Sequence, residues 1–225
     1  MLFKKSNIKI NKIKFKMSKN EDEEKIIFKI ITLGETGVGK TSIIRRYIYN
    51  QYNNDCLSTI GLYIFFKDII LKNKEKVQLK IIDAGDQDKF RPYSKSHFKN
   101  ADGVFFVYAI NDKESFNKIK GWITSFNESN NGVKVIKYLL ESKNDLDRVV
   151  DEEKSKEFAK NNNLKWYSVS AKNDKSINEI YEDIAESIYQ EYIKKDNRKQ
   201  RNIQLKKEKK KKKNPCISSN NLEDI

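Results

Sequence analysis

The chain has 225 residues, of which 37% are hydrophobic and 35% are charged, and a formal net charge of +14. This composition suits one soluble domain with tails and excludes a membrane-spanning protein, because no apolar run approaches the roughly 20 residues that cross a bilayer. Two cysteines far apart in the sequence give neither a disulfide framework nor a metal-ligand spacing, and favour a reducing compartment.

The positive charge lies at the two ends of the chain. Residues 1–20 contain seven lysines and no acid, whereas residues 194–213 contain twelve lysines or arginines and two acids. The residues between these ends carry a charge of about −1. We therefore expect one domain over residues 25–193, a basic disordered extension over 1–24 and a disordered polybasic tail over 194–225.

The first residues allow three interpretations. They mix Ile and Phe with Lys and lack the continuous apolar centre of a secretory signal. A transit peptide is one alternative, and an extension upstream of a start at Met17 is another. The basic composition favours a disordered extension.

Apolar runs alternate with helical patterns along the domain. Residues 26–33 are nearly all apolar, as in a strand buried on both faces. Further strand-like runs occupy residues 60–71, 77–82, 103–110, 134–140 and 164–169. Helical spacing covers Ser42–Asn50, Glu114–Phe126, Asp151–Asn161 and Ile177–Ile193. This alternation predicts an α/β sandwich with a mostly parallel sheet, and the short polar link after the second run predicts one antiparallel hairpin.

A glycine-rich loop connects the first strand to the first helix. Its residues are Gly34, Glu35, Thr36, Gly37, Val38, Gly39, Lys40 and Thr41, followed by Ser42. They match G-x-x-x-x-G-K-[ST], in which backbone N–H groups surround a phosphate at the start of a helix. We expect Lys40 to reach the β- and γ-phosphates and the Thr41 hydroxyl to ligate Mg²⁺.

Three further residues fit the same site. Thr59 precedes the second strand, where its hydroxyl could complete the Mg²⁺ shell or simply begin the strand. Asp83 ends the third strand, and is suited to hold Mg²⁺ through water. Gln87 is the candidate that orients the attacking water.

Two later segments are candidates for binding a purine base. Ser142, Lys143 and Asp145 follow the fifth apolar run, and a carboxylate there can accept both donors of guanine, which adenine does not offer. A second segment, which follows the last run, could close the base pocket with its backbone N–H groups; it comprises Ser170, Ala171 and Lys172.

In this order the motifs resemble those of Ras-superfamily small GTPases, and most closely those of the Rab family. The resemblance covers about residues 25–193 and includes S-T-I-G at 58–61, K-N-D-L at 143–146 and S-A-K at 170–172. Lys89-Phe90-Arg91 and Trp122 add Rab-like character. The segment Gly61-Leu62-Tyr63 departs from the family, because Rab proteins usually carry an acid there.

The resemblance implies a P-loop fold of the small G-protein type, a three-layer sandwich with six strands and five helices. It also implies GTP or GDP with Mg²⁺, Lys40 and Gln87 as catalytic residues, and two switch loops near residues 51–61 and 84–99. Effectors, exchange factors and GTPase-activating proteins would bind the switch regions of a monomer, on a face that includes Ile60, Phe65 and Phe90. Core packing is the alternative role for Phe65.

The loop after the third strand departs from the family. It reads D-A-G-D-Q where the family has D-T-A-G-Q, so Asp86 replaces the glycine whose N–H meets the γ-phosphate. A Cβ restricts the backbone there, and a carboxylate repels the phosphate. We expect weakened sensing of the γ-phosphate, with slow hydrolysis or a preference for GDP.

The base motif also departs from the family, because Ser142 replaces its asparagine. The shorter side chain predicts a looser base contact and a looser tie to the phosphate loop, by about 1 kcal/mol, one ordinary hydrogen bond.

The end of the chain provides no terminal prenylation motif. Cys216-Ile217-Ser218-Ser219 resembles one, but six residues follow it, so Cys216 is either acylated or an idle thiol. The basic run Lys206–Lys213 predicts reversible binding to anionic membranes. It also fits a nuclear signal or a non-specific contact with nucleic acid, and no sequence-specific nucleic-acid binding is expected.

The motifs therefore predict a Rab-like GTPase that acts as a switch in vesicle trafficking, cytoplasmic and peripheral on endomembranes. The alternative is a degenerate GTPase that serves as a scaffold with little hydrolysis, as Asp86 and Ser142 suggest. A P-loop kinase or ATPase lacks support, since no lid or second-substrate segment is visible.

Overall fold

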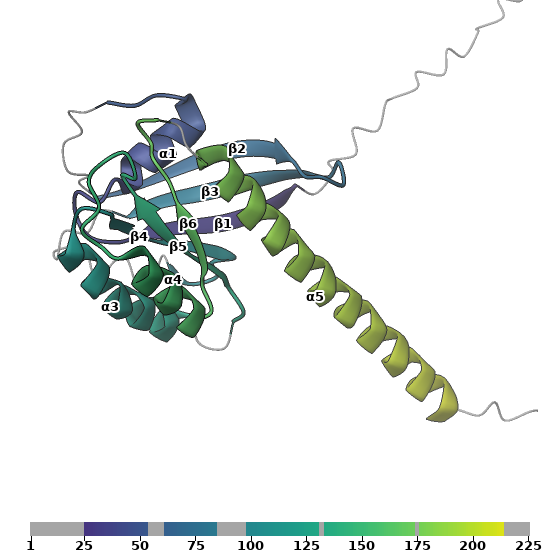
Figure 1. The fold of residues 1–225 in the computed structure, drawn as a ribbon. Coiled ribbons are helices and arrows are strands. Elements are labelled where there is room, and N and C mark those ends of the chain that lie inside the picture. The colour runs from purple at the N-terminus through teal and green to yellow at the C-terminus, as the bar shows by residue number, and fades with distance from the viewer. Residues whose placement is uncertain (1–24, 54–60, 85–97, 131–132, 174–175, 214–225) are drawn as a thin grey trace, which may run out of the picture.

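A single six-stranded sheet separates two helical layers (Figure 1). The computed structural model describes residues 25–53, 61–84, 98–130, 133–173 and 176–213, the last sixteen by their backbone alone. The strand order is β2-β3-β1-β4-β5-β6. Their bounds are β1 Ile26–Leu33, β2 Leu62–Ile70, β3 Lys76–Ala84, β4 Gly103–Ala109, β5 Ile136–Ser142 and β6 Lys165–Ser168.

β1 lies in the middle of the sheet and pairs in parallel with β3 and β4. Its side chains alternate between the two faces, so Ile30 and Ile31 enter different hydrophobic clusters and both are fully buried. A strand buried on both faces carries apolar residues at nearly every position. This is the physical reason for the continuous apolar run in the sequence.

β2 and β3 form the predicted antiparallel hairpin at one edge of the sheet. The turn between them is closed by two backbone hydrogen bonds that join Leu71 to Lys74 and to Glu75. Every other strand pair is parallel. The predicted class, a mostly parallel six-stranded sheet in a three-layer sandwich, is confirmed.

Four helices cover the two faces in the described part of the chain, one fewer than the five expected. They are α1 (Lys40–Tyr49), α3 (Lys113–Ser129), α4 (Glu152–Asn161) and α5 (Ile177–Lys213). α1 and α5 supply one hydrophobic cluster, and α3 and α4 supply the other (Figure 1). Asp112 caps α3 through the N–H groups of Glu114 and Ser115, and Asp151 caps α4.

α5 continues to Lys213, well past the domain end expected at residue 193, and extends away from the sheet (Figure 1). Residues 194–213 are thus helical where the sequence predicted disorder. They contain neither Gly nor Pro, and Lys, Gln and Glu propagate a helix that is already nucleated. Pro215 lies two residues beyond the helix. No helix in the described residues is long and apolar enough to cross a membrane.

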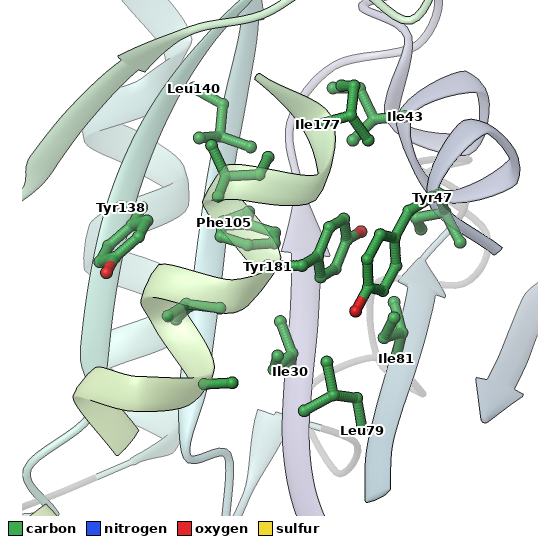
Figure 2. Close-up of a cluster of buried hydrophobic side chains, with 14 of the residues drawn as sticks. Ile30, Ile43, Tyr47, Leu79, Ile81, Phe105, Tyr138, Leu140, Ile177 and Tyr181 are labelled. Atoms are coloured by element: carbon green, nitrogen blue, oxygen red, sulfur yellow. The ribbon is translucent and has the colours of Figure 1, made fainter. Parts of the chain in front are cut away.

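Tyr181 of α5 is the centre of the cluster between the sheet and the helices α1 and α5 (Figure 2). Its ring stacks on Tyr47 of α1 with centroids 3.8 Å apart, and meets Phe105 of β4 edge-on at 5.1 Å. The Tyr181 hydroxyl is buried, and no described residue makes a hydrogen bond of good geometry to it. Burial holds the pKa of this hydroxyl well above its usual range.

We predict that Tyr181→Ala lowers the free energy of unfolding by about 3–5 kcal/mol, because a large buried aromatic ring is lost. Tyr181→Phe should stay within about 1 kcal/mol of the wild type, since the hydroxyl it removes is unpaired. Urea denaturation followed by circular dichroism measures both changes. The half-exposed Tyr192 provides the control, and a Tyr192→Ala loss as large as that of Tyr181→Ala would contradict the prediction.

Candidate functional site

The phosphate loop, residues 34–39, lies between the carboxyl end of β1 and the start of α1. Gly34, Gly37 and Gly39 all have positive φ angles, of 148°, 76° and 94°. A Cβ on Gly34 would lie 2.1 Å from the carbonyl oxygen of Val107 in β4. Gly34 is therefore required by close packing of the loop on β4, as well as by its backbone conformation.

The Lys40 side chain folds back over the loop that precedes it. Its Nζ donates hydrogen bonds to the carbonyl oxygens of Gly34, at 2.8 Å, and Glu35, at 2.7 Å. The residue is only 6% exposed. A buried ammonium beside backbone N–H groups at a helix start is an anion-binding arrangement.

Glu35 anchors the loop to α3. Its two carboxylate oxygens accept hydrogen bonds from the indole Nε1 of Trp122, at 3.0 Å, and from Nζ of Lys118, at 3.1 Å. The sequence placed Glu35 in the phosphate loop without assigning its side chain a role. The structure directs that side chain to α3, where it joins the loop to the second layer.

Thr41 and Asp83 meet at the carboxyl end of β3. The Thr41 hydroxyl donates to Oδ2 of Asp83 at 2.6 Å. Asp83 is fully buried, and burial raises the pKa of its carboxyl above the usual value. Oδ1 of Asp83 is buried and has no hydrogen-bond partner among the described residues. An orphaned carboxylate oxygen beside a hydroxyl is a combination that a hard cation would satisfy.

The chemistry of these two side chains, a hydroxyl and a buried carboxylate, fits Mg²⁺. Mg²⁺ usually takes one or two carboxylates and completes its shell with water and substrate phosphates. The described residues contain no group of three or more acids, histidines or cysteines that would form an all-protein metal site, and such a group is not needed here. Thr59, the third predicted ligand, lies outside the described residues.

A cavity of about 210 Å³ adjoins the phosphate loop. Four segments form it: the start of α1, the residues after α1, the end of β5 with the loop that follows it, and the loop before α5. Its lining comprises Gly39, Ser42, Ile43, Tyr52, Ser142, Lys143, Asp145, Leu146, Ala171 and Lys172. The predicted base-reading residues and the phosphate loop are thus brought together around one space.

Asp145 lines this cavity, and a hydrogen bond from Ser170 holds its side chain. Its Oδ1 accepts a hydrogen bond from the Ser170 hydroxyl at 2.6 Å, and the backbone N–H of Asn173 donates to the same hydroxyl at 3.1 Å. Ser170 therefore orients Asp145, a role that the sequence did not predict. Lys143 has a φ of 59°, unusual for a residue with a Cβ, and its carbonyl accepts from the N–H of Leu146.

Three lining residues were missed by the sequence reasoning, namely Ile43, Tyr52 and Leu146. Tyr52 lies three residues beyond α1, and an aromatic ring in a base pocket offers a stacking surface. The sequence signal that could have identified Tyr52 is an aromatic residue shortly after the helix that follows the phosphate loop. Ile43 and Leu146 give no sequence signal beyond their apolar character.

Ser142 does contact the phosphate loop, whereas the expected loosening relative to an asparagine stays a prediction. The Ser142 hydroxyl lies 2.5 Å from the carbonyl oxygen of Val38 and 2.8 Å from that of Tyr108, so its one hydrogen is shared between them. Ser142 is 2% exposed. The backbone approaches closely enough here for a short side chain to make the link.

The remaining predicted site residues divide into two groups. Asp86 and Gln87, like Ile60 and Phe90, lie outside the described residues, so their predicted roles stay predictions. Phe65 is partly buried, packs against the core and meets Tyr49 edge-on at 6.3 Å, which supports its packing role.

Comparison with known proteins identifies the family of this site. A family model described as the Ras family matches residues 29–190. The chain belongs to the Ras family. Ras-related protein Rab-10 of Caenorhabditis elegans is 33% identical over 165 residues, which cover 72% of this chain and 81% of the relative. GTP-binding protein YPT1 of Saccharomyces cerevisiae is 33% identical over 164 residues, 72% of this chain and 79% of the relative.

The relatives make this Ras-family protein Rab-like, as its motifs predicted. Ras-related protein Rab-13 of Bos taurus is a further relative, 30% identical over 164 residues that cover 72% of this chain and 80% of the relative. The matched region contains the phosphate loop, Asp83 and both segments that were predicted to read the base. The residues that line the cavity therefore all lie within the region that matches the Ras family.

We predict that Gly34→Ala destabilises this Rab-like protein by about 1–3 kcal/mol more than Gly37→Ala does, because only the first methyl group collides with β4. Both glycines have positive φ, so backbone strain is common to the two variants. A Cβ on Gly37 meets nothing within 4 Å. Urea denaturation gives the difference, and equal losses in the two variants would count against the close contact with Val107.

Proposed function

We propose that the protein is a GTPase that binds GTP and GDP with Mg²⁺, hydrolyses GTP slowly and acts as a switch in membrane trafficking. The observation that carries the proposal is that the cavity lined by Asp145 extends to Gly39, the last residue of the phosphate loop, directly before the buried Lys40. A nucleotide requires this combination, a cation and N–H groups for its phosphates and a selective acceptor for its base.

The residues divide the work in the proposed site. Lys40 and the N–H groups of the phosphate loop hold the β- and γ-phosphates, and Asp145 accepts the two donors of guanine. Tyr52 lines the base pocket. Thr41, Asp83 and Thr59 would hold Mg²⁺, which when bound neutralises charge that develops on the phosphates. Gln87 positions the attacking water.

We expect slow hydrolysis of GTP because these residues include no identified arginine that would neutralise charge on the phosphates. Catalysis of phosphoryl transfer relies mainly on positioning and on neutralising charge, to which an arginine from a partner often contributes. The sequence identifies no such arginine within this chain. We propose that a GTPase-activating protein supplies it, and that effectors and exchange factors bind the switch regions.

The membrane contact is proposed for the basic end of α5. The segment Lys206–Lys213 carries seven lysines and one glutamate, and each cation near an anionic surface contributes about 1 kcal/mol. Binding of this kind is reversible and weakens with salt. It fits a monomer that is peripheral on the cytosolic face of endomembranes.

We predict selective binding of guanine nucleotides. Titration with fluorescently labelled GDP and ADP should give at least tenfold tighter binding of GDP, because ADP leaves the Asp145 carboxylate without its two donors. Asp145→Ala should remove most of this preference. Comparable affinities for GDP and ADP in the wild type would refute the assignment of the base.

We predict that Asp86→Gly raises the ratio of GTP affinity to GDP affinity by several-fold, because it removes a carboxylate near the γ-phosphate. The measurement is competition of unlabelled GTP and GDP against a labelled nucleotide. Single-turnover phosphate release, with and without an activating protein, then separates a slow GTPase from a scaffold without hydrolysis. Equal affinity ratios in the wild type and the variant would rule out the effect of Asp86.

A further inference from the structure

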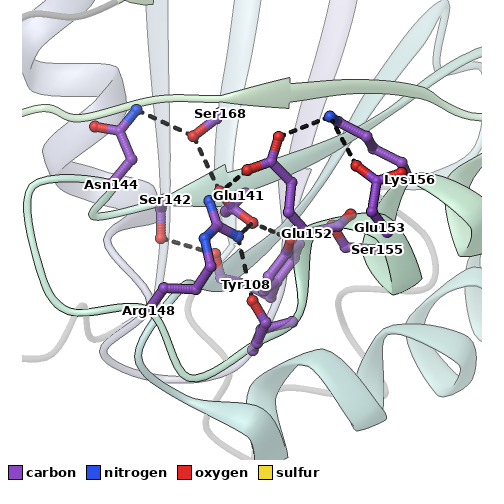
Figure 3. A network of polar contacts seen from close by, with 11 residues as sticks. Tyr108, Glu141, Ser142, Asn144, Arg148, Glu152, Glu153, Ser155, Lys156 and Ser168 are labelled. Atoms are coloured by element: carbon purple, nitrogen blue, oxygen red, sulfur yellow. Dashed lines mark hydrogen bonds and ion pairs between the residues drawn. The ribbon is translucent and has the colours of Figure 1, made fainter.

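A buried carboxylate that the proposed mechanism does not use lies directly before the base-reading loop. Glu141 is the penultimate residue of β5 and is fully buried. Both oxygens accept hydrogen bonds from Arg148, at 2.7 Å each, so the ion pair is bidentate (Figure 3). A buried carboxylate is stable only when its partners are complete, and here they are.

Two further donors complete the environment of Glu141. The Tyr108 hydroxyl on β4 donates to Oε2 at 2.7 Å, and the Ser168 hydroxyl on β6 donates to Oε1 at 3.0 Å. The carboxylate thus joins three adjacent strands to Arg148 (Figure 3). Donation to the negatively charged Glu141 also holds the pKa of Arg148 above its ordinary value.

The ion pair closes the segment that reads the base. Glu141 and Arg148 flank residues 142–147, which include Ser142, Lys143 and Asp145. Within that segment, Nδ2 of Asn144 donates to the Ser168 hydroxyl at 3.0 Å. Because that hydroxyl in turn donates to Glu141, the loop is also linked to the carboxylate indirectly, through Ser168. Lys143 holds a positive φ, a conformation that persists only when surrounding contacts enforce it.

We propose that Glu141 and Arg148 are positioning residues, whose buried ion pair holds Asp145 in place for guanine and thereby sets how long the nucleotide stays bound and how selectively. This inference rests on the proposed function. Glu141 and Arg148 do not line the cavity, so their effect on the nucleotide passes through the loop. The Ser170 contact orients the Asp145 side chain, whereas the ion pair fixes the backbone that carries it.

The test measures release of labelled GDP and labelled IDP from the full-length protein, chased with excess unlabelled nucleotide. IDP lacks the exocyclic amine of guanine and so makes one hydrogen bond fewer to the Asp145 carboxylate. Glu141→Gln and Arg148→Met should each release GDP about tenfold faster, the equivalent of one lost hydrogen bond to the base. The difference between the GDP and IDP rates should shrink at the same time.

Graded variants keep the test informative if Glu141→Gln folds poorly. Tyr108→Phe removes one donor and keeps the buried ring, and should accelerate GDP release by about threefold. Arg148→Lys keeps the charge but loses the bidentate geometry, and should fall between the wild type and Arg148→Met.

A second ion pair provides matched controls. Asp183 of α5 accepts from Nζ of Lys165 on β6 at 2.6 Å, and neither residue lines the cavity. Asp183→Asn and Lys165→Met should leave both the GDP rate and the GDP to IDP ratio at their wild-type values. Thermal unfolding of all variants records any general loss of stability.

The outcomes separate the two proposals. Variants that release GDP at the wild-type rate, or that accelerate GDP and IDP by the same factor, would overturn the positioning role, since a merely loosened fold gives the second result. A wild-type protein that binds no guanine nucleotide would overturn this inference together with the proposed function.

Discussion

Parallel pairing of β1 with β3 and β4 is the constraint on which the site depends. Parallel strands end at the same edge of a sheet, so the residues after each strand meet there although they are far apart in sequence. Thr32 pairs with Asp83, and Leu33 pairs with Phe106. The phosphate loop after β1 and Asp83 at the end of β3 are neighbours for this reason, and β5 adds beside them the loop that is proposed to read the base.

Buried polar contacts then fix the loops that the sheet brings together. The Ser142 hydroxyl holds the carbonyl of Val38, Glu35 reaches Trp122, and Glu141 holds Arg148. Each contact joins a loop of the site to a strand or helix behind it. Irregular backbone keeps a defined shape only when its polar groups find such partners. The reason is that leaving a buried polar group unpaired destabilises the fold by more than one hydrogen bond stabilises it.

A buried polar atom at the carboxyl edge of the sheet lacks a hydrogen bond within the described residues. Oδ1 of Asp83 is buried and finds no hydrogen-bond partner in the part of the chain that the structure describes, and burial raises the pKa of that carboxyl. The charged form is therefore disfavoured until a cation or a donor arrives. Residues that bind ligands often leave a buried polar atom without a hydrogen bond, and packing elsewhere offsets the lost stability. The stacked rings of Tyr47 and Tyr181 belong to the hydrophobic core on the same side of the sheet.

The sequence by itself determined the class of fold and the position of the phosphate loop, and it predicted which residues read the base, because apolar periodicity and motif spacing are local properties. It did not reveal that Ser142 still reaches Val38, that Tyr52 lines the cavity beside the phosphate loop, or that Glu141 is paired with Arg148. Whether a short side chain reaches a carbonyl, or a buried acid finds its cation, depends on backbone distances across strands. Only the tertiary structure decides those distances, because they follow from the packing of segments that the sequence keeps far apart.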